Sequence, residues 1–318
     1  MEYRRLIKFG NSSFVVSVPK YWLKKNQLEK GDMVYLTENG SNELIVSSNL
    51  EDTAPESLSY SLNVEGLDES DIERRIISKY LAGYDTFTLQ GEKALHEKHT
   101  YIRNLLNSLM ALEIVEQTKN TIVAKDLLNP SEISFKVIVR RIDTILRSMF
   151  EDLQHLSEED ESADILRRDK DINRLSFLSS RIAKKCIHHP PLAKRLDTNV
   201  LQLLFYKELI EHMELIADEV KRIARNLHQF GQSPKKLPDF FSIYDRVYKI
   251  YLDAMKSVYN QDQALAYSVA KERETLMDAC NIAIKKHKDP LIYSSFERLK
   301  AAIVFIRNVA RLIYREGA

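Results

Sequence analysis

Glycine, proline and cysteine are scarce in this 318-residue chain, and each shortage excludes a class of structure. Eight glycines and eight prolines are few turn-forming residues for this length, which favours long helices over an architecture of many strands and turns. The two cysteines, Cys186 and Cys280, lie on separate predicted helices, and a chain able to bury a large core does not depend on a disulfide. We therefore expect a mainly α-helical protein with small β and α+β parts, whose thiols are reduced and buried.

Long apolar runs and a large net charge are also missing. No run approaches the about 20 apolar residues that cross a bilayer, and the first residues lack the apolar core of a signal peptide. The formal net charge is +1, so the molecule as a whole has no field that attracts a polyanion. These absences predict a cytoplasmic protein that is not membrane-spanning, and any nucleic-acid function must come from a local patch.

Such a patch is present in the first 25 residues. Glu2 is their only acidic residue, and it stands against six basic ones, Arg4, Arg5, Lys8, Lys20, Lys24 and Lys25. The next 25 residues reverse the sign, with one lysine against four carboxylates. A local concentration of positive charge is typical of a phosphate-binding surface, although basic segments also serve simply to keep a surface in solution.

Residues 1–49 are predicted to form a small β-rich domain. The pattern indicates, in order, a strand, a turn at Gly10-Asn11-Ser12, a second strand that ends at Pro19, a short helix over 21–26, and a hairpin of 34–37 with 44–47 about Asn39-Gly40. About fifty residues of this kind bury too little apolar surface to be stable alone. A homodimer would supply the missing core.

Two further domains are predicted beyond a short acidic linker. Over 58–129 the order strand, helix, strand, helix and hairpin indicates a βαβαββ domain with its helices on one face of a small sheet. From 131 to 318 apolar residues recur every three or four positions, the period of buried helices. Two runs of three long helices, about 131–231 and 238–316, predict a bundle of two three-helix repeats.

Three carboxylates in the first repeat are the best candidates for chemistry. Glu214 and Asp218 are four residues apart on one predicted helix and share a face, while Asp169 lies in the apolar stripe of the preceding helix. A buried carboxylate needs a partner, and the spacing leaves open an arginine such as Arg168 or Arg174, a proton or a metal ion. Brought together, the three would form an all-oxygen site that suits Mg²⁺, Mn²⁺ or iron; neutralisation by arginines is the alternative.

Other suggestive groups are weaker candidates. His96 and His99 are three residues apart, whereas the helical zinc motif needs four, so exposed histidines are the better interpretation. Cys186, His188 and His189 lie at the end of a predicted helix, which explains them better than a metal site does. Packing explains the helical stripe of Tyr244, Tyr248 and Tyr251 better than a cofactor does. No glycine-rich phosphate loop, nucleophile elbow or paired CxxC motif occurs, so we expect no enzyme.

Three short segments near the N-terminus carry a family resemblance: Lys8-Phe9-Gly10-Asn11-Ser12, Val18-Pro19-Lys20 and Lys30-Gly31-Asp32. With them, the stretch from Arg5 to Val46 resembles the AbrB/MazE/SpoVT swapped-hairpin domain. The resemblance implies an intertwined dimer whose basic strand and first loop face DNA, although some members serve mainly to dimerise. The DNA contacts that it implies are Arg4, Arg5, Lys8, Asn11, Ser12 and Lys20.

The predicted bundle, about Glu132 to Glu316, resembles PhoU, a phosphate-uptake regulator of two three-helix repeats. Residues 167–173 look like its second-helix signature, and Glu214 to Asp218 look like its third-helix metal motif. The resemblance implies a divalent or trivalent metal, such as iron, manganese or magnesium, on Asp169, Glu214 and Asp218. The matching turn of the second repeat, 304–308, has lost both carboxylates, which argues against a second site.

The pairing of these two resemblances is the arrangement of archaeal phosphate-uptake regulators. It implies a phosphate-responsive transcriptional regulator that binds DNA through its N-terminal domain and senses or docks through its bundle. The alternative is a scaffold that binds no DNA, in which the first domain only dimerises and the bundle docks on a phosphate transporter ATPase or another phosphate-signalling protein.

Overall fold

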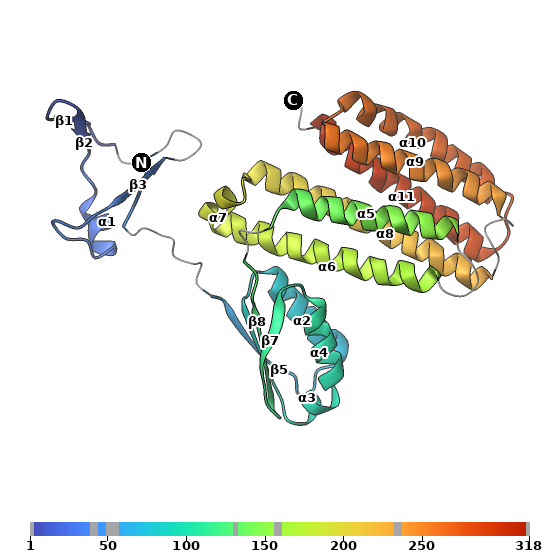
Figure 1. Cartoon of the computed structure of the whole chain (residues 1–318), viewed down its shortest axis with the longest axis horizontal. Coiled ribbons are helices and arrows are strands. Elements are labelled where there is room, and N and C mark those ends of the chain that lie inside the picture. Colours follow the sequence, from blue (N-terminus) through green and yellow to red (C-terminus); the bar gives the residue numbers. More distant parts are fainter. Residues whose placement is uncertain are drawn as a thin grey trace. The chain divides into compact units, whose positions relative to one another are not determined.

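The computed structural model describes residues 3–38, 44–48, 57–129, 133–155, 161–231 and 237–315. The chain divides into two compact units, residues 1–56 and 57–318, which we describe separately (Figure 1). As expected from the sequence, the protein is mainly helical, with small sheets and a C-terminal region of several helices.

The described residues of the first unit form two short strand pairs and one helix: β1 (Ile7–Phe9) with β2 (Ser13–Val15), α1 (Lys20–Lys25), and β3 (Tyr35–Glu38) with β4 (Leu44–Ser47). Both strand pairs are antiparallel, and Lys8 lies opposite Phe14 in the first. Gly10 begins the turn between β1 and β2 with φ 68°, a left-handed torsion that favours glycine. The predicted turn at Asn39-Gly40 lies outside the described residues.

None of the residues that the structure describes in this unit is buried. Phe9, Phe14 and Leu36 leave 69%, 65% and 61% of their surface exposed. Each Å² of apolar surface removed from water is worth about 25 cal/mol, so these side chains represent stabilisation that the isolated unit does not obtain.

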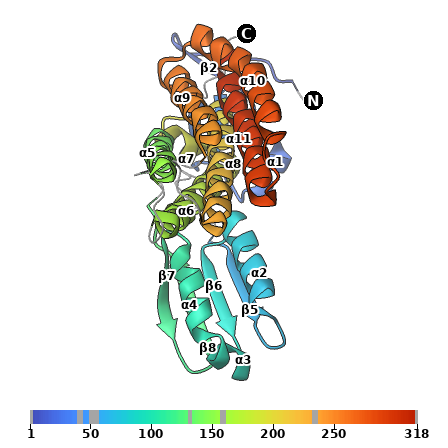
Figure 2. The ribbon, with the colours of Figure 1, turned by 90° about the vertical axis from the view of Figure 1, so that its right-hand side faces the viewer.

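The second unit begins with a four-stranded sheet. Its elements are β5 (Ser59–Asn63), α2 (Glu69–Leu81), β6 (Thr86–Gln90), α3 (Lys93–Glu97), α4 (His99–Ser108), β7 (Leu112–Gln117) and β8 (Thr121–Asp126). The strand order is β5-β6-β8-β7, with β5 parallel to β6 and the other pairs antiparallel. Buried residues of α2 and α4 form one core with the sheet and cover one of its faces (Figure 2). The second helix of the predicted βαβαββ order is instead two helices, α3 and α4, because Lys98 departs from helical torsions at φ −101° and ψ 12°.

In the described part of the remaining chain, six long helices and one short helix follow (Figure 1). They are α5 (Phe135–Gln154), α6 (Glu161–His188), α7 (Pro190–Arg195), α8 (Val200–Phe230), α9 (Pro238–Asn260), α10 (Gln263–Ile284) and α11 (Pro290–Arg315). Six long helices are thus present where the sequence predicts two runs of three. The short helix α7 was not expected. Pro190 and Pro191 end α6, but proline is also suited to the first turn of a helix, and here it begins one.

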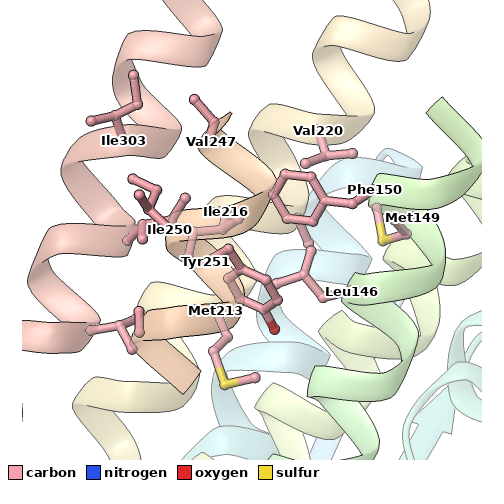
Figure 3. Close-up of a cluster of buried hydrophobic side chains, with 14 of the residues drawn as sticks. Leu146, Met149, Phe150, Met213, Ile216, Val220, Val247, Ile250, Tyr251 and Ile303 are labelled. Carbon is pink, nitrogen blue, oxygen red and sulfur yellow. The ribbon is translucent and has the colours of Figure 1, made fainter. Parts of the chain in front are cut away.

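Buried tyrosines of α9 join the two runs of helices. The Tyr251 hydroxyl donates to Asp143 Oδ1 at 2.7 Å, and the Tyr244 hydroxyl donates to the Phe150 carbonyl at 3.0 Å. Figure 3 shows Tyr251 beside Leu146 and Phe150 of α5. The tyrosine stripe therefore packs inside the bundle, as predicted.

A buried ion-pair network joins α6 to the sheet domain. The Arg181 side chain is only 1% exposed, and its Nη2 lies 2.6 Å from Asp126 Oδ2 and 3.1 Å from Asp85 Oδ1. Its Nη1 donates to the Tyr80 carbonyl at 2.6 Å, and Lys185 Nζ contacts both carboxylates as well. Burial alone would raise the pKa of Asp126, but the bonds and charge of Arg181 hold it below its usual value.

No helix among the described residues is both long enough and apolar enough to cross a membrane.

Candidate functional site

The predicted DNA contacts all lie on exposed positions of the first unit. Lys8 is in β1, and Asn11 and Ser12 are in the turn that follows it. Every one of the six is exposed: Arg4, Arg5, Lys8, Asn11, Ser12 and Lys20. The side chains that the sequence singles out are therefore accessible to a large ligand.

The register of β1 and β2 decides which side chains share a face of the first hairpin. Successive residues of a strand point to opposite faces, and residues directly opposite each other on paired strands share a face. The register places Ile7 opposite Val15 and Phe9 opposite Ser13. One face therefore carries Ile7, Phe9 and Val15, whereas Lys8 projects from the other face beside Phe14. Three apolar side chains suited to association thus lie together on one face, and the basic side chain suited to phosphate lies on the opposite face next to one aromatic ring.

The acidic cluster of the first repeat is centred on a lysine. Asp169 of α6 is 4% exposed, as predicted, and its Oδ2 accepts a hydrogen bond from Lys221 Nζ of α8 at 2.9 Å. Lys221 Nζ also donates to Asp218 Oδ1, and Arg222 Nη2 donates to Asp218 Oδ2 at 3.1 Å. The structure thus brings Asp169 and Asp218 together through one shared ammonium group.

The partner of Asp169 is neither of the arginines that the sequence suggested. Arg168 Nε lies 3.2 Å from Asp152 Oδ2, and Arg174 Nη1 lies 3.6 Å from Asp171 Oδ1. The sequence prediction missed Lys221. A signal for it was available, because Lys221 follows Asp218 by three residues and so lies on the same helix face.

Glu214 is the third carboxyl group of the cluster. Burial, followed by repulsion from Asp218 and Asp169, raises its pKa to about 7. Burial likewise raises the pKa of Asp169, against the opposing effect of Lys221. Burial alone would lower the pKa of Lys221, but its hydrogen bonds to Asp169 and Asp218 raise that pKa above its usual value. The ammonium group is therefore firmly charged, and Glu214 holds its proton at higher pH than an ordinary glutamate.

The described residues do not fit a metal ion at this place as they are arranged. No group of three or more histidine, cysteine, aspartate and glutamate side chains among them could hold one. Lys221 Nζ occupies the position between Asp169 and Asp218 where a cation would share their oxygens. Asp169 Oδ1 is buried and has no hydrogen-bond partner, so one oxygen of the cluster remains unused.

The histidine and cysteine candidates are not brought together. His96 is exposed, and His99 Nε2 lies 2.6 Å from Gln117 Nε2. Cys186 is buried in the core, which raises the pKa of its thiol to about 11, while His188 is exposed. Cys280 is also buried and free, as expected.

Comparison with known proteins adds no relative, because no family model, no curated protein and no solved structure matches the chain.

Proposed function

We propose that this protein is a dimeric, non-enzymatic transcriptional regulator that binds DNA through its N-terminal domain and responds to phosphate through its helical bundle. One observation carries the proposal: the first unit exposes its basic side chains and its apolar side chains alike, and no described residue in it is buried.

The apolar side chains support a dimer. Ile7 and Phe9 are 60% and 69% exposed on one face of the β1–β2 hairpin. A second copy, interlocked in the manner of a swapped hairpin, would bury them and would double the number of basic side chains on one surface.

The basic side chains support DNA as the ligand. Each lysine or arginine that neutralises a phosphate releases a counterion, so binding weakens steeply as salt is added. Arg5 and Lys8 would make such contacts, while Asn11 could read a base edge through its amide. The proposed response to phosphate rests on the resemblance of about 132–316 to PhoU, and the bundle would act by biasing the placement of the paired N-terminal domains.

Salt titration of DNA binding tests the first part. We expect the full-length protein to bind a fluorescent promoter duplex, and Arg5→Glu with Lys8→Glu to abolish the specific complex. In a dimer of the wild type, the four contacts of these two residues should contribute about 3 to 4 to the slope of log affinity against log salt. Lys119→Glu with Lys170→Glu makes the same change of charge at exposed positions of the second unit and should leave binding unaltered.

Two outcomes would contradict the proposal. Failure of the full-length protein to bind duplexes at low salt would favour the scaffold, in which the first domain only dimerises. Recovery of the same genomic DNA with the protein from phosphate-rich and phosphate-starved cells would contradict the proposed response to phosphate.

A further inference from the structure

We propose that Lys221 is a built-in cation that takes the place of a metal ion between Asp169 and Asp218, and that the first helical repeat is consequently metal-independent. The proposal is separate from DNA binding, because it concerns the second unit and is tested by metal content.

Geometry is the first support. Lys221 Nζ lies 2.9 Å from Asp169 Oδ2 and is hydrogen-bonded to Asp218 Oδ1, so one positive centre is shared by carboxylates of α6 and α8. A metal ion coordinated by the same two groups would need the same space. The ammonium supplies the bridging charge and donates hydrogen bonds, which an acceptor-only carboxylate requires.

Burial makes this arrangement difficult to displace. The side chains of Lys221 and Asp169 are 13% and 6% exposed. A metal that entered would have to leave the ammonium group without its partners in a largely desolvated position, and an unpaired buried charge is strongly unfavourable. Because Lys221 is covalently part of α8, it is also present at a constant and high effective concentration beside its two carboxylates.

The balance of charge leads to the same conclusion. Arg222 is shared between Asp218 Oδ2 at 3.1 Å and Glu219 Oε1 at 3.2 Å, and Arg298 lies 3.7 Å from Glu219 Oε2. Lys221 and these two arginines therefore match the two aspartates and Glu219 in number, and Glu214 is the carboxyl without a basic partner in this count. Asp169 Oδ1 is buried and has no hydrogen-bond partner, so removal of the lysine would leave both oxygens of Asp169 without a hydrogen-bonded cation.

Replacement of Lys221 tests the proposal in the full-length protein. Lys221→Met keeps the approximate length and the apolar stem of the side chain and removes its charge. We expect the wild-type protein to be purified without metal and to show no Mn²⁺ binding by calorimetry. Lys221→Met should bind one Mn²⁺ per chain at least about 100-fold more tightly, and Asp169→Asn in the same variant should abolish that gain.

Matched variants make the result specific. Lys207→Met makes the same chemical change on an exposed position of α8 and should gain no metal. Lys221→Arg retains a cation and should also remain metal-free. If Lys221→Met does not fold, as judged by circular dichroism, the shorter neutral variant Lys221→Gln replaces it.

Either of two results would overturn the proposal. One is stoichiometric metal in the wild-type protein that disappears on Asp169→Asn, which would mean that the lysine yields to metal. The other is a folded, neutral Lys221 variant that gains no Mn²⁺ affinity, which would mean that the lysine is not what excludes it.

Discussion

Residues 1–56 and 57–318 use basic side chains in opposite ways. In the first unit Arg5 and Lys8 are exposed, and no described residue is buried. In the second unit Arg181 is almost fully buried and is surrounded by two carboxylates and a carbonyl. A basic residue that is committed to internal partners holds a fold together, whereas one that is left exposed remains available to a ligand.

The same contrast applies to apolar surface. The second unit fills its cores with its own residues, and the buried carboxylate of Asp143 accepts hydrogen bonds from side chains such as Tyr251. The first unit leaves comparable aromatic and aliphatic side chains in water. Its stability should therefore depend on association, and that of the second unit should not.

Removal of the Arg181 charge should produce the largest effect. Arg181→Met leaves Asp126 buried beside Lys185 alone, and breaking a buried ion pair costs about 3–5 kcal/mol. Urea unfolding of the full-length protein should show this loss in the transition of the second unit. Arg74→Met, which removes an exposed pair with Asp71, should cost much less, because solvent screens an exposed ion pair. Equal losses in the two variants would mean that the buried network does not support the fold.

A charge on the apolar hairpin face should produce the next largest effect. Ile7→Asp would have to be desolvated on association, so we expect the dimer dissociation constant to rise about 30- to 100-fold, or about 2–3 kcal/mol. Sedimentation velocity over a range of concentrations measures it. Val115→Asp, on an exposed position of β7, is the control and should leave association unchanged. A wild-type protein that is monomeric at every concentration would contradict the expectation that the first unit is stabilised by association.

Helical periodicity predicts much of this fold, because it depends only on local spacing. The stripe of α5, for example, places Ile138, Ile142 and Met149 in the core as expected. Periodicity does not tell which surface a buried face meets. Arg181 illustrates the limit, because its partners Asp85 and Asp126 lie 96 and 55 residues away in a different domain.

The acidic cluster shows the same limit at a candidate site. The apolar stripe around Asp169 predicts its burial and its need for a partner, and both are confirmed. The identity of the partner depends on how α8 packs on α6, since Lys221 is 52 residues away. Nearby arginines were the natural expectation from sequence, but they point to other carboxylates.

The smallest predicted effect concerns Glu214 and the pH dependence of the second unit. Burial first, and then Asp218 and Asp169, raise the pKa of this carboxyl to about 7 in the folded state. Below the ordinary glutamate pKa both states hold the proton, so the folded protein incurs no cost there. As the pH rises toward 7 the unfolded chain releases the proton while the folded chain retains it, so the free energy of unfolding falls.

Glu214→Gln removes this titration and should make stability depend less on pH. Between pH 5 and pH 8 we expect the variant to lose about 1 kcal/mol less than the wild type, after allowance for screening by solvent at a partly exposed group. Urea midpoints at the two pH values measure the difference. Glu211→Gln, an exposed change on the same helix, should retain the wild-type dependence, because its carboxyl lies outside the cluster. An unchanged pH dependence in Glu214→Gln would mean that the bundle tolerates a third negative charge beside Lys221, and the packing of α6 on α8 would then be looser than the contacts of Asp169 imply.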